Sequence, residues 1–191
     1  MADKLIPTPG QTVGPFFALG LDRPEWADLA RHNPDGERIT IEGRVLDGNG
    51  APVPDALIES WQANAAGRYD HVEDTQSDKR IDPNFHGYGR VATDAEGRFR
   101  ITTVKPGPVP GRGNALQAPH LNIAFFARGL LRQLSTRIYF SDEPANASDP
   151  LLSSIEDVGV RQTLIARRGK GGAYHFDFIL QGAGETAFLD I

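Results

Sequence analysis

The sequence contains no cysteine and only one methionine among its 191 residues. The lack of cysteine excludes disulfide bonds, a thiolate nucleophile and any zinc or iron–sulfur centre held by cysteine. No run approaches the roughly 20 apolar residues that a membrane-spanning helix needs. The first ten residues, MADKLIPTPG, carry acidic and proline residues where a signal peptide needs an apolar segment. These absences favour a cytoplasmic protein without a membrane partner.

Positive charge is also scarce, since 20 Lys and Arg face 25 Asp and Glu for a formal net charge of −5. Non-specific nucleic-acid binding depends on a basic surface, so we expect no nucleic-acid partner. The length favours one domain over residues 1–191, with a core of ordinary size. We divide it into an N-terminal arm, residues 1–35, and a folded body, residues 36–191.

Short segments of alternating apolar residues predict strands. The clearest is Ile39–Asp47, where apolar residues recur with a period of two before an Asn-Gly turn. Residues 90–94 and Phe99–Val104 flank the turn AEGR and predict a hairpin. Further strands are expected at residues 56–63, 120–127, 135–140, 162–168 and 174–182.

Helical signals are weak, because only residues 23–32 and 149–157 fit a few helical turns. Many short strands joined by Gly- and Pro-rich connections predict an all-β fold, an antiparallel β-sandwich with few short helices. Two long loops, residues 68–90 and 105–119, exceed what a minimal sandwich needs, and long loops tend to carry function.

The N-terminal arm contains TPGQTVGPFF, which is rich in proline and glycine and has little periodicity. This composition predicts an extended arm that lies on another surface. The pair Phe16-Phe17 would form a costly apolar patch on a monomer, so it predicts a contact with a second protein.

The stretch QAPHLNIAFF places His120 and Asn122 two residues apart on a predicted strand, so both side chains point to one face. A His-x-His metal pair would use this spacing, but an asparagine stands at the second position. A lone strand histidine is more often a hydrogen-bonded structural residue than a ligand. The residues alone therefore leave open whether this strand serves a metal.

Three long runs resemble the intradiol ring-cleavage dioxygenases. They are RVLDGNGAPVPDALIESWQANAAGRY, DPNFHGYGRVATDAEGRFRITTVKPGPVPGR and PHLNIAFFARG. The resemblance extends from QTVGPFF near the N-terminus to GAGETAFLDI at the C-terminus, so it covers nearly the whole chain. It implies a prealbumin-like β-sandwich of the intradiol dioxygenase type, with an extended N-terminal arm.

Iron-bearing members of this family hold a ferric ion with two tyrosines and two histidines. The resemblance matches those ligands to Tyr69, Val109, His120 and Asn122. Tyr69 and His120 keep donor side chains of the family's kind, whereas Val109 has no donor atom and Asn122 offers only a neutral amide. Ferric iron favours anionic oxygen, and one of the two phenolates is lost at Val109. We therefore expect no iron in this chain.

Some members of the family pair an iron-binding beta chain with a homologous alpha chain that lacks the ligand set, and this sequence is similar to the second kind. The resemblance implies that Fe(III) is held by the beta subunit, in a higher-order assembly of alpha–beta pairs. It implies protocatechuate (3,4-dihydroxybenzoate) and O2 as substrates and 3-carboxy-cis,cis-muconate as product. This reaction belongs to the beta-ketoadipate pathway of aromatic-compound catabolism.

The same resemblance implies that four residues of this chain line the substrate pocket, namely Thr12, Gly14, Pro15 and Arg128. A guanidinium suits a substrate with a ring carboxylate, because its donor fork matches two carboxylate oxygens. Glycine lets the backbone come close to a ligand. Without the resemblance, Arg128 would more simply pair with a neighbouring acid.

Two other interpretations remain. Transthyretin-like sandwiches share strand pairs of the GxPxxxAxIE kind and do no chemistry, but the arm and the DPNFHGYGR loop are extra to that minimal module. A self-sufficient homomeric dioxygenase would need unusual metal ligands such as His71 or His86. Metal bound to the isolated chain would distinguish that case from an iron-free subunit.

Overall fold

The computed structural model describes residues 6–14, 16–111, 113 and 115–190. Its strands are β1 (Arg38–Leu46), β2 (Leu57–Trp61), β3 (Tyr88–Ala92), β4 (Arg98–Val104), β5 (Val109–Pro110), β6 (Leu116–Gln117), β7 (His120–Phe126), β8 (Leu134–Phe140), β9 (Ile165–Arg168), β10 (Ala173–His175) and β11 (Phe178–Ile179). Its helices are short: α1 (Phe16–Leu21), α2 (Pro150–Ser154), α3 (Val158–Gln162) and the 3₁₀ helices η1 (Pro24–Ala27), η3 (Pro144–Ser148) and η4 (Lys170–Gly172). Within the described residues, no helix has the length and apolar character needed to cross a membrane.

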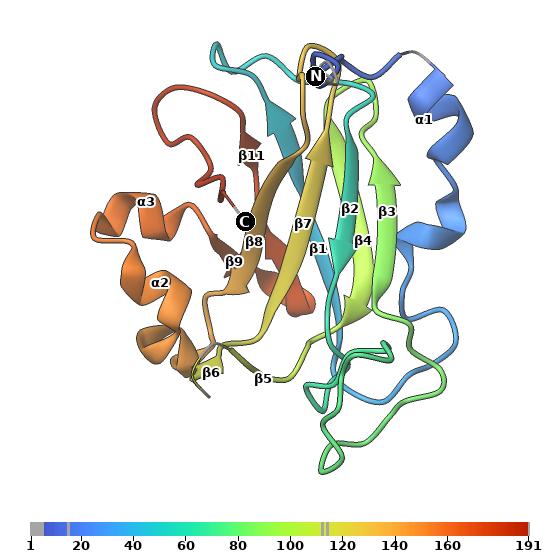
Figure 1. Cartoon of the computed structure of the whole chain (residues 1–191), viewed down its shortest axis with the longest axis vertical. Helices are drawn as coiled ribbons and strands as arrows, with labels where there is room; N and C mark the ends of the chain where they lie inside the picture. Colours follow the sequence, from blue (N-terminus) through green and yellow to red (C-terminus); the bar gives the residue numbers. More distant parts are fainter. Residues whose placement is uncertain (1–5, 15, 112, 114, 191) are drawn as a thin grey trace, which may run out of the picture.

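Most strands join in one curled sheet with the order β11-β1-β10-β9-β8-β7-β2-β3, in which β4 also pairs with β1 (Figure 1). Strand β9 links the two halves of this sheet. It pairs in parallel with β8, where Tyr139 faces Ile165, and antiparallel with β10, where Tyr174 faces Arg168. Strands β5 and β6 form a separate small pair.

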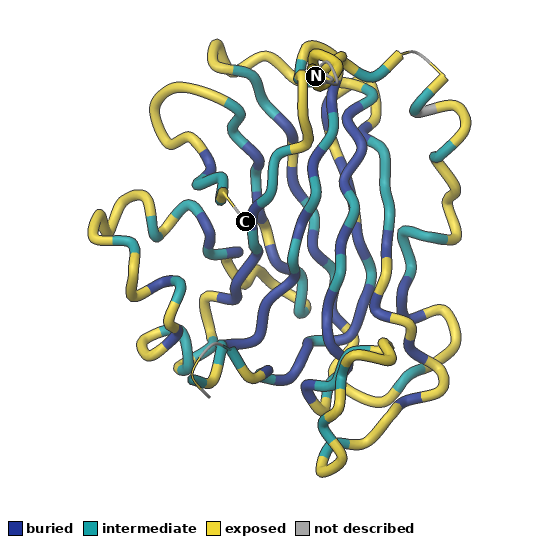
Figure 2. The backbone as a smooth tube through the Cα atoms, viewed as in Figure 1, coloured by how far each residue is buried: buried dark blue, intermediate teal, exposed yellow. Residues whose placement is uncertain are grey.

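The core lies between the two halves of the curled sheet. On β1, Ile39 and Ile41 are 2% and 0% exposed, and on β7 the buried side chains are Leu121, Ile123 and Phe125. Figure 2 shows this alternation of buried and half-buried residues along the strands, with exposed residues in the loops. The period of two in the sequence therefore sends alternate residues of β1 into the core and leaves those between them half-buried or exposed. Strand β8 departs from this pattern, because Ile138, Tyr139 and Phe140 at its end are all buried.

The predicted architecture, mostly strand with few short helices, is confirmed. The purely antiparallel arrangement is wrong, because the sheet is mixed: β1 pairs in parallel with β10 and β11, and β8 with β9. The predicted hairpin of β3 and β4 is also wrong in its pairing. The turn closes, with Asp94 N donating to Arg98 O at 3.0 Å, but β3 pairs with β2 and β4 with β1. Apolar alternation marks a strand without naming its partner.

The N-terminal arm is less extended than the sequence predicts, because it contains α1 and η1. It lies along the same chain: the ring of Phe17 packs on Phe126 at the end of β7, with centroids 5.4 Å apart. Phe16 points away and is 81% exposed. One member of the predicted apolar pair is thus used within the chain and the other is free for a second protein.

Candidate functional site

The residues that the sequence singles out gather at the two ends of β7. The start cluster comprises Tyr69, Val109, His120 and Asn122, at the beginning of the strand and around it. The end cluster comprises Thr12, Gly14 and Arg128, where the arm meets the loop that follows the strand. In Figure 1 the strand runs between β5 and β6 at one end and the arm near Thr12 at the other.

Asn122 ties Tyr69 to the sheet. Its Nδ2 donates to the Tyr69 hydroxyl and to the Trp61 carbonyl, each at 3.3 Å. The Tyr69 ring stacks on Trp61, with centroids 5.8 Å apart and planes 12° from parallel. Burial raises the pKa of Tyr69 above its ordinary value, against the lowering effects of the Asn122 hydrogen bond and the Arg137 charge. The phenol is therefore neutral at pH 7 and serves as a packed, hydrogen-bonded aromatic group.

His120 is 3% exposed and is held by its own segment of chain. Its Nδ1 lies 2.7 Å from the Ala118 carbonyl, so this nitrogen carries the proton and donates. Nε2 is buried and makes no hydrogen bond to any described residue. Burial, followed by the Arg137 charge, lowers the pKa of His120 to about 4. The ring is thus neutral at pH 7, as expected for a structural histidine.

Val109 fills its position with apolar volume. It is 3% exposed and pairs with Gln117 across the small β5–β6 ladder. No atom of its side chain can donate to or accept from a ligand, so this part of the start cluster is closed by packing.

Arg137 completes the start cluster, although the sequence did not single it out. It lies opposite Asn122 in the β7–β8 register. Its Nη1 donates to Gln117 Oε1 at 2.6 Å and to the Tyr139 hydroxyl at 3.2 Å. The Tyr139 hydroxyl in turn donates to Asp149, a fully buried carboxylate, at 3.1 Å. In sequence Arg137 is one polar residue of an alternating strand, and only the strand register shows that it faces Asn122.

The start cluster does not fit ferric iron. It offers one phenol, one imidazole, a neutral amide and an aliphatic side chain, together with a guanidinium that can only donate. Among the described residues, no group of three or more His, Cys, Asp or Glu side chains is arranged to hold a metal ion. Of the alternative ligands, His86 Nδ1 is 2.7 Å from Asp70 Oδ2, and His71 Nδ1 accepts from the backbone N–H of Glu73.

The end cluster joins residues that lie far apart in sequence. The Thr12 hydroxyl accepts from the Gly129 N–H at 2.7 Å, which fixes the arm beside Arg128. Arg128 is 63% exposed, and its Nε lies 2.9 Å from Asp55 Oδ2. The structure thus places Thr12 close to Arg128. It also shows that Arg128 pairs with a neighbouring acid, Asp55, as expected for this arginine without the family resemblance.

Gly14 is an exposed residue of the same arm. A Cβ built there would meet nothing within 4 Å, and its carbonyl accepts from the Phe17 N–H at 3.1 Å at the start of α1. Its backbone is therefore open to a neighbouring molecule. Pro15, the fourth residue that the sequence predicts here, lies outside the described residues.

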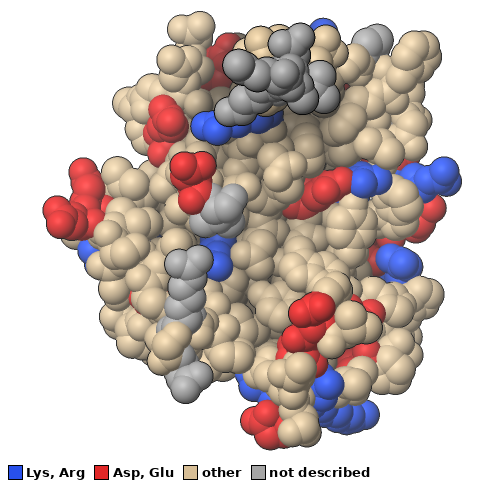
Figure 3. Space-filling view, viewed as in Figure 1, with Lys and Arg blue, Asp and Glu red and all other residues tan. Residues whose placement is uncertain are grey.

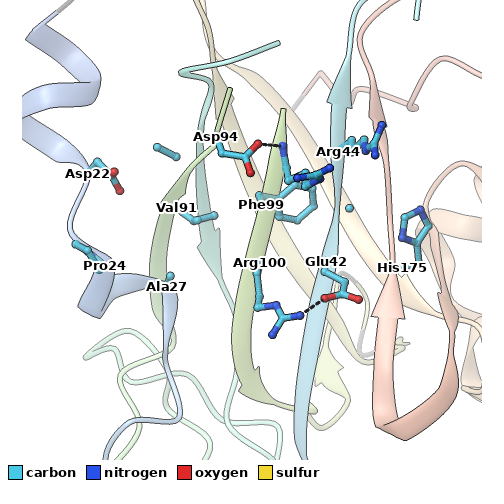
Figure 4. Close-up of a pocket in the computed structure, with 13 residues that line it drawn as sticks. Asp22, Pro24, Ala27, Glu42, Arg44, Val91, Asp94, Phe99, Arg100 and His175 are labelled. Carbon is cyan, nitrogen blue, oxygen red and sulfur yellow. Dashed lines mark hydrogen bonds and ion pairs between the residues drawn. The ribbon is translucent and has the colours of Figure 1, made fainter. Parts of the chain in front are cut away.

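One cavity opens at the start cluster, and a larger one lies away from both clusters. One of about 360 Å³ opens beside Tyr69, and its walls include Trp61, Asp74 and Pro110. A larger one, about 630 Å³, lies elsewhere, between the arm and strands β1 and β4 (Figure 4). Its Arg100 and Glu42 are paired at 2.6 Å, and no residue of either cluster lines it.

Comparison with known proteins gives a consistent result. A family model described as "Dioxygenase" matches residues 14–182. The chain is 42% identical to the protocatechuate 3,4-dioxygenase alpha chain of Pseudomonas putida over the full length of both. It is 43% identical to the protocatechuate 3,4-dioxygenase beta chain of Burkholderia cepacia, over 80% of this chain and 68% of that one. Among solved structures, the dioxygenase domain of a dioxygenase–carbohydrate-binding fusion protein from Streptomyces sp. SirexAA-E is 29% identical, with a TM-score of 0.62, and the match covers 93% of this chain and 100% of that chain.

Proposed function

The chain belongs to the intradiol ring-cleavage dioxygenase family, and on this premise we propose that it is the iron-free alpha subunit of a protocatechuate 3,4-dioxygenase. In this proposal a homologous beta subunit holds Fe(III), and the substrate lies between the two chains. The reaction consumes protocatechuate and O2 and gives 3-carboxy-cis,cis-muconate. The carbon–carbon bond between the two hydroxyl-bearing carbons breaks, and both oxygen atoms of O2 enter the product.

The observation that carries the proposal is the donor set of the start cluster. Tyr69 and His120 persist there, but Val109 is an aliphatic group in a packed ladder and Asn122 is a neutral donor. A chain that is similar over its full length to an alpha chain, and whose own residues do not fit the metal, is best explained as the iron-free member of a pair.

This chain contributes the end cluster to the pocket. Arg128 orients the ring carboxylate of protocatechuate, because its exposed guanidinium is held at Nε by Asp55 and presents its remaining edge to solvent. Thr12 supports this arrangement by fixing the arm to Gly129. Gly14, and Pro15 beside it, bring the arm backbone close to the ligand. The chain thus contributes to substrate binding and orientation, which hold the substrate in a reactive geometry.

The surface of the chain supports a large contact with a second protein. Ile6, Phe16 and Leu19 of the arm are 90%, 81% and 79% exposed, and such apolar groups are costly in water. Figure 3 shows charged side chains in small separate groups, with uncharged surface between them over β2, β7 and β8. The proposal also includes repeated alpha–beta pairs, a prealbumin-like β-sandwich in each chain and a cytoplasmic location.

The test is native mass spectrometry with iron analysis on this chain purified from its own cells. We expect a second chain of similar size in equal number, about one iron per pair, and oxygen uptake that depends on protocatechuate. A homo-oligomer without iron would favour a binding module instead. A homo-oligomer with iron would favour the self-sufficient dioxygenase.

A further inference from the structure

Arg137 brings a permanent positive charge into the start cluster. It begins opposite Asn122 in the β7–β8 register, and its Nη1 reaches Gln117 Oε1 at 2.6 Å. Gln117 itself lies opposite Val109 in the β5–β6 pair. The arginine therefore extends from the Asn122 position to the Val109 side of the cluster. These are the two positions that have no side chain of the iron-binding kind.

A second hydrogen bond, to Tyr139, also holds the guanidinium in this position. Its Nη1 also donates to the Tyr139 hydroxyl at 3.2 Å, and the Tyr139 ring packs on His120 with centroids 5.4 Å apart. Tyr139 is anchored by its hydrogen bond to the buried Asp149. Arg137 Nε is also buried, but it makes no hydrogen bond to any described residue. The arginine cannot leave the cluster without breaking both hydrogen bonds of its Nη1, to Gln117 and to Tyr139.

A metal ion at the same place would meet strong repulsion. An arginine side chain stays charged at any pH that a folded protein experiences, so it cannot yield by losing a proton. Like charges a few ångströms apart in a partly buried position repel strongly, and the repulsion grows with the charge of the metal ion.

We propose that Arg137 excludes metal cations from the start cluster, so that restoring the two missing ligands would not by itself restore a metal site. The inference rests on the proposed function, which matches Tyr69, Val109, His120 and Asn122 to the ligand positions of the family. It adds a second reason why this chain binds no iron: the positive charge of Arg137 repels a metal ion, besides the lack of ligand side chains at Val109 and Asn122.

The experiment compares three forms of the full chain, each carrying V109Y and N122H. One keeps Arg137, one adds R137K and one adds R137Q. Lysine carries a positive charge that, unlike that of arginine, can be lost by deprotonation beside a metal ion, whereas glutamine removes the charge and keeps a polar side chain of moderate length. Each is purified in the same assembly as the wild type, and ferric nitrilotriacetate is added. Iron gained per copy over the wild type is measured together with the visible phenolate-to-iron absorption.

We expect the R137Q form to gain about one iron per chain. The form with Arg137 should gain none, or bind iron at least about tenfold more weakly, and the R137K form should lie between the other two. Equal iron binding in all three forms would overturn the proposal.

Val109 is buried, so V109Y overpacks its site and could prevent folding. A second pair, N122H with Arg137 retained and N122H/R137Q, leaves Val109 in place and is titrated with Zn²⁺. Tyr69, His120 and the introduced imidazole then supply three donors. We expect the glutamine form to bind Zn²⁺ at least about tenfold more tightly than the form with Arg137, and equal affinities would overturn the proposal.

The iron content of the wild-type chain distinguishes a failure of this inference from a failure of the proposed function. Iron bound to the wild-type chain itself would overturn both. A wild-type chain without iron, combined with equal metal binding by the charged and neutral variants, would overturn only the role of Arg137.

Discussion

The two ends of β7 each hold an arginine among residues that the sequence singled out, but in opposite surroundings. At the start of the strand, Arg137 donates to Gln117 and Tyr139 and is partly buried. At the other end, Arg128 is 63% exposed and contacts Asp55 through Nε. The first is enclosed by its own chain, and the second is open to other molecules.

This difference separates two uses of a polar residue. Most buried polar groups are satisfied within the chain, and most of those in the start cluster join a network whose bonds stabilise the fold, although His120 Nε2 and Arg137 Nε have no partner among the described residues. An exposed charged group contributes little to stability and stays available for a ligand. We therefore expect changes at the start cluster to affect folding, and changes at the end cluster to affect the reaction.

The largest effect on stability is expected at Asp149, in the buried hydrogen-bond network beside the start cluster. Its carboxylate accepts from the Tyr139 hydroxyl and from three backbone N–H groups, those of Ala118, Leu151 and Leu152. Replacing Asp149 by alanine leaves these donors unpaired, and we expect the free energy of unfolding to fall by about 3–5 kcal/mol. Urea unfolding measures the change.

Asp157 provides the matched control. It is an exposed N-cap that accepts from the backbone N–H groups of Gly159 and Val160 at the start of α3. Replacing Asp157 by alanine should cost about 1 kcal/mol. An equal decrease in the free energy of unfolding for the two variants would mean that the buried network stabilises the fold no more than an exposed helix cap does.

A second prediction concerns pH and His120. Its pKa is lowered from 6.5 to about 4, first by burial and then by the Arg137 charge. The stabilising contribution is therefore complete above pH 6.5 and is lost as pH falls toward 4, because the unfolded chain takes up the proton first. Between pH 7 and pH 5 the free energy of unfolding should fall by about 2 kcal/mol on this account.

The variant H120Q isolates this contribution, since every other titrating group remains. We expect its free energy of unfolding to decrease less between pH 7 and pH 5 than that of the wild type. Identical pH dependence would show that His120 is not held in the neutral form.

The third prediction moves to the exposed end of β7. Replacing Arg128 by alanine removes a charged hydrogen-bond donor from the proposed pocket, so kcat/KM for protocatechuate should fall by about 10- to 100-fold. Iron content should not change. With catechol, which has no carboxylate, the effect should be much smaller. Replacing the exposed Arg132 by alanine is the control, and unchanged kinetics in the Arg128 variant would remove that residue from the pocket.

The smallest effect is expected at Thr12. Replacing it by alanine deletes the 2.7 Å hydrogen bond from Gly129 in an exposed setting, which is worth about 0.5–1 kcal/mol. Hydrogen exchange of the Gly129 amide should become a few times faster, while T12S keeps the hydroxyl and the wild-type rate. Unchanged exchange in the alanine variant would show that the arm is fixed by other contacts.

Much of the fold is readable from the sequence because alternation is local. The predicted Ile39–Asp47 strand agrees with β1 within one residue at each end, and the strand predicted from His120 begins where β7 begins. Residues 162–168 were expected to be strand throughout, but α3, which Asp157 caps, ends at Gln162 and β9 begins only at Ile165. Residues 174–182 divide into β10 and β11, where Asp177 accepts from the Arg44 N–H.

The candidate site is only partly readable, because it depends on register. The spacing of His120 and Asn122 correctly placed both on one face of β7, away from the core residues between them. Arg137 and Asp149 reach this place through β8 and α2, and no local pattern links them to it. Pairing between strands is set by the whole sheet, so the residue that most changes the chemistry of the start cluster was found only in the structure.

The parallel pairing of β1 with β10 and β11 affects how the chain folds during its synthesis. Arg44 and Asp177, 133 residues apart in the chain, are joined by a 2.8 Å hydrogen bond. One edge of β1 can pair with β4 as soon as residues 98–104 are made, but the other edge pairs only with β10 and β11, and such distant pairing folds slowly. During synthesis this second edge of β1 therefore stays unpaired long after β4 has formed. We expect the nascent chain to depend on chaperones until residues 173–179 have left the ribosome.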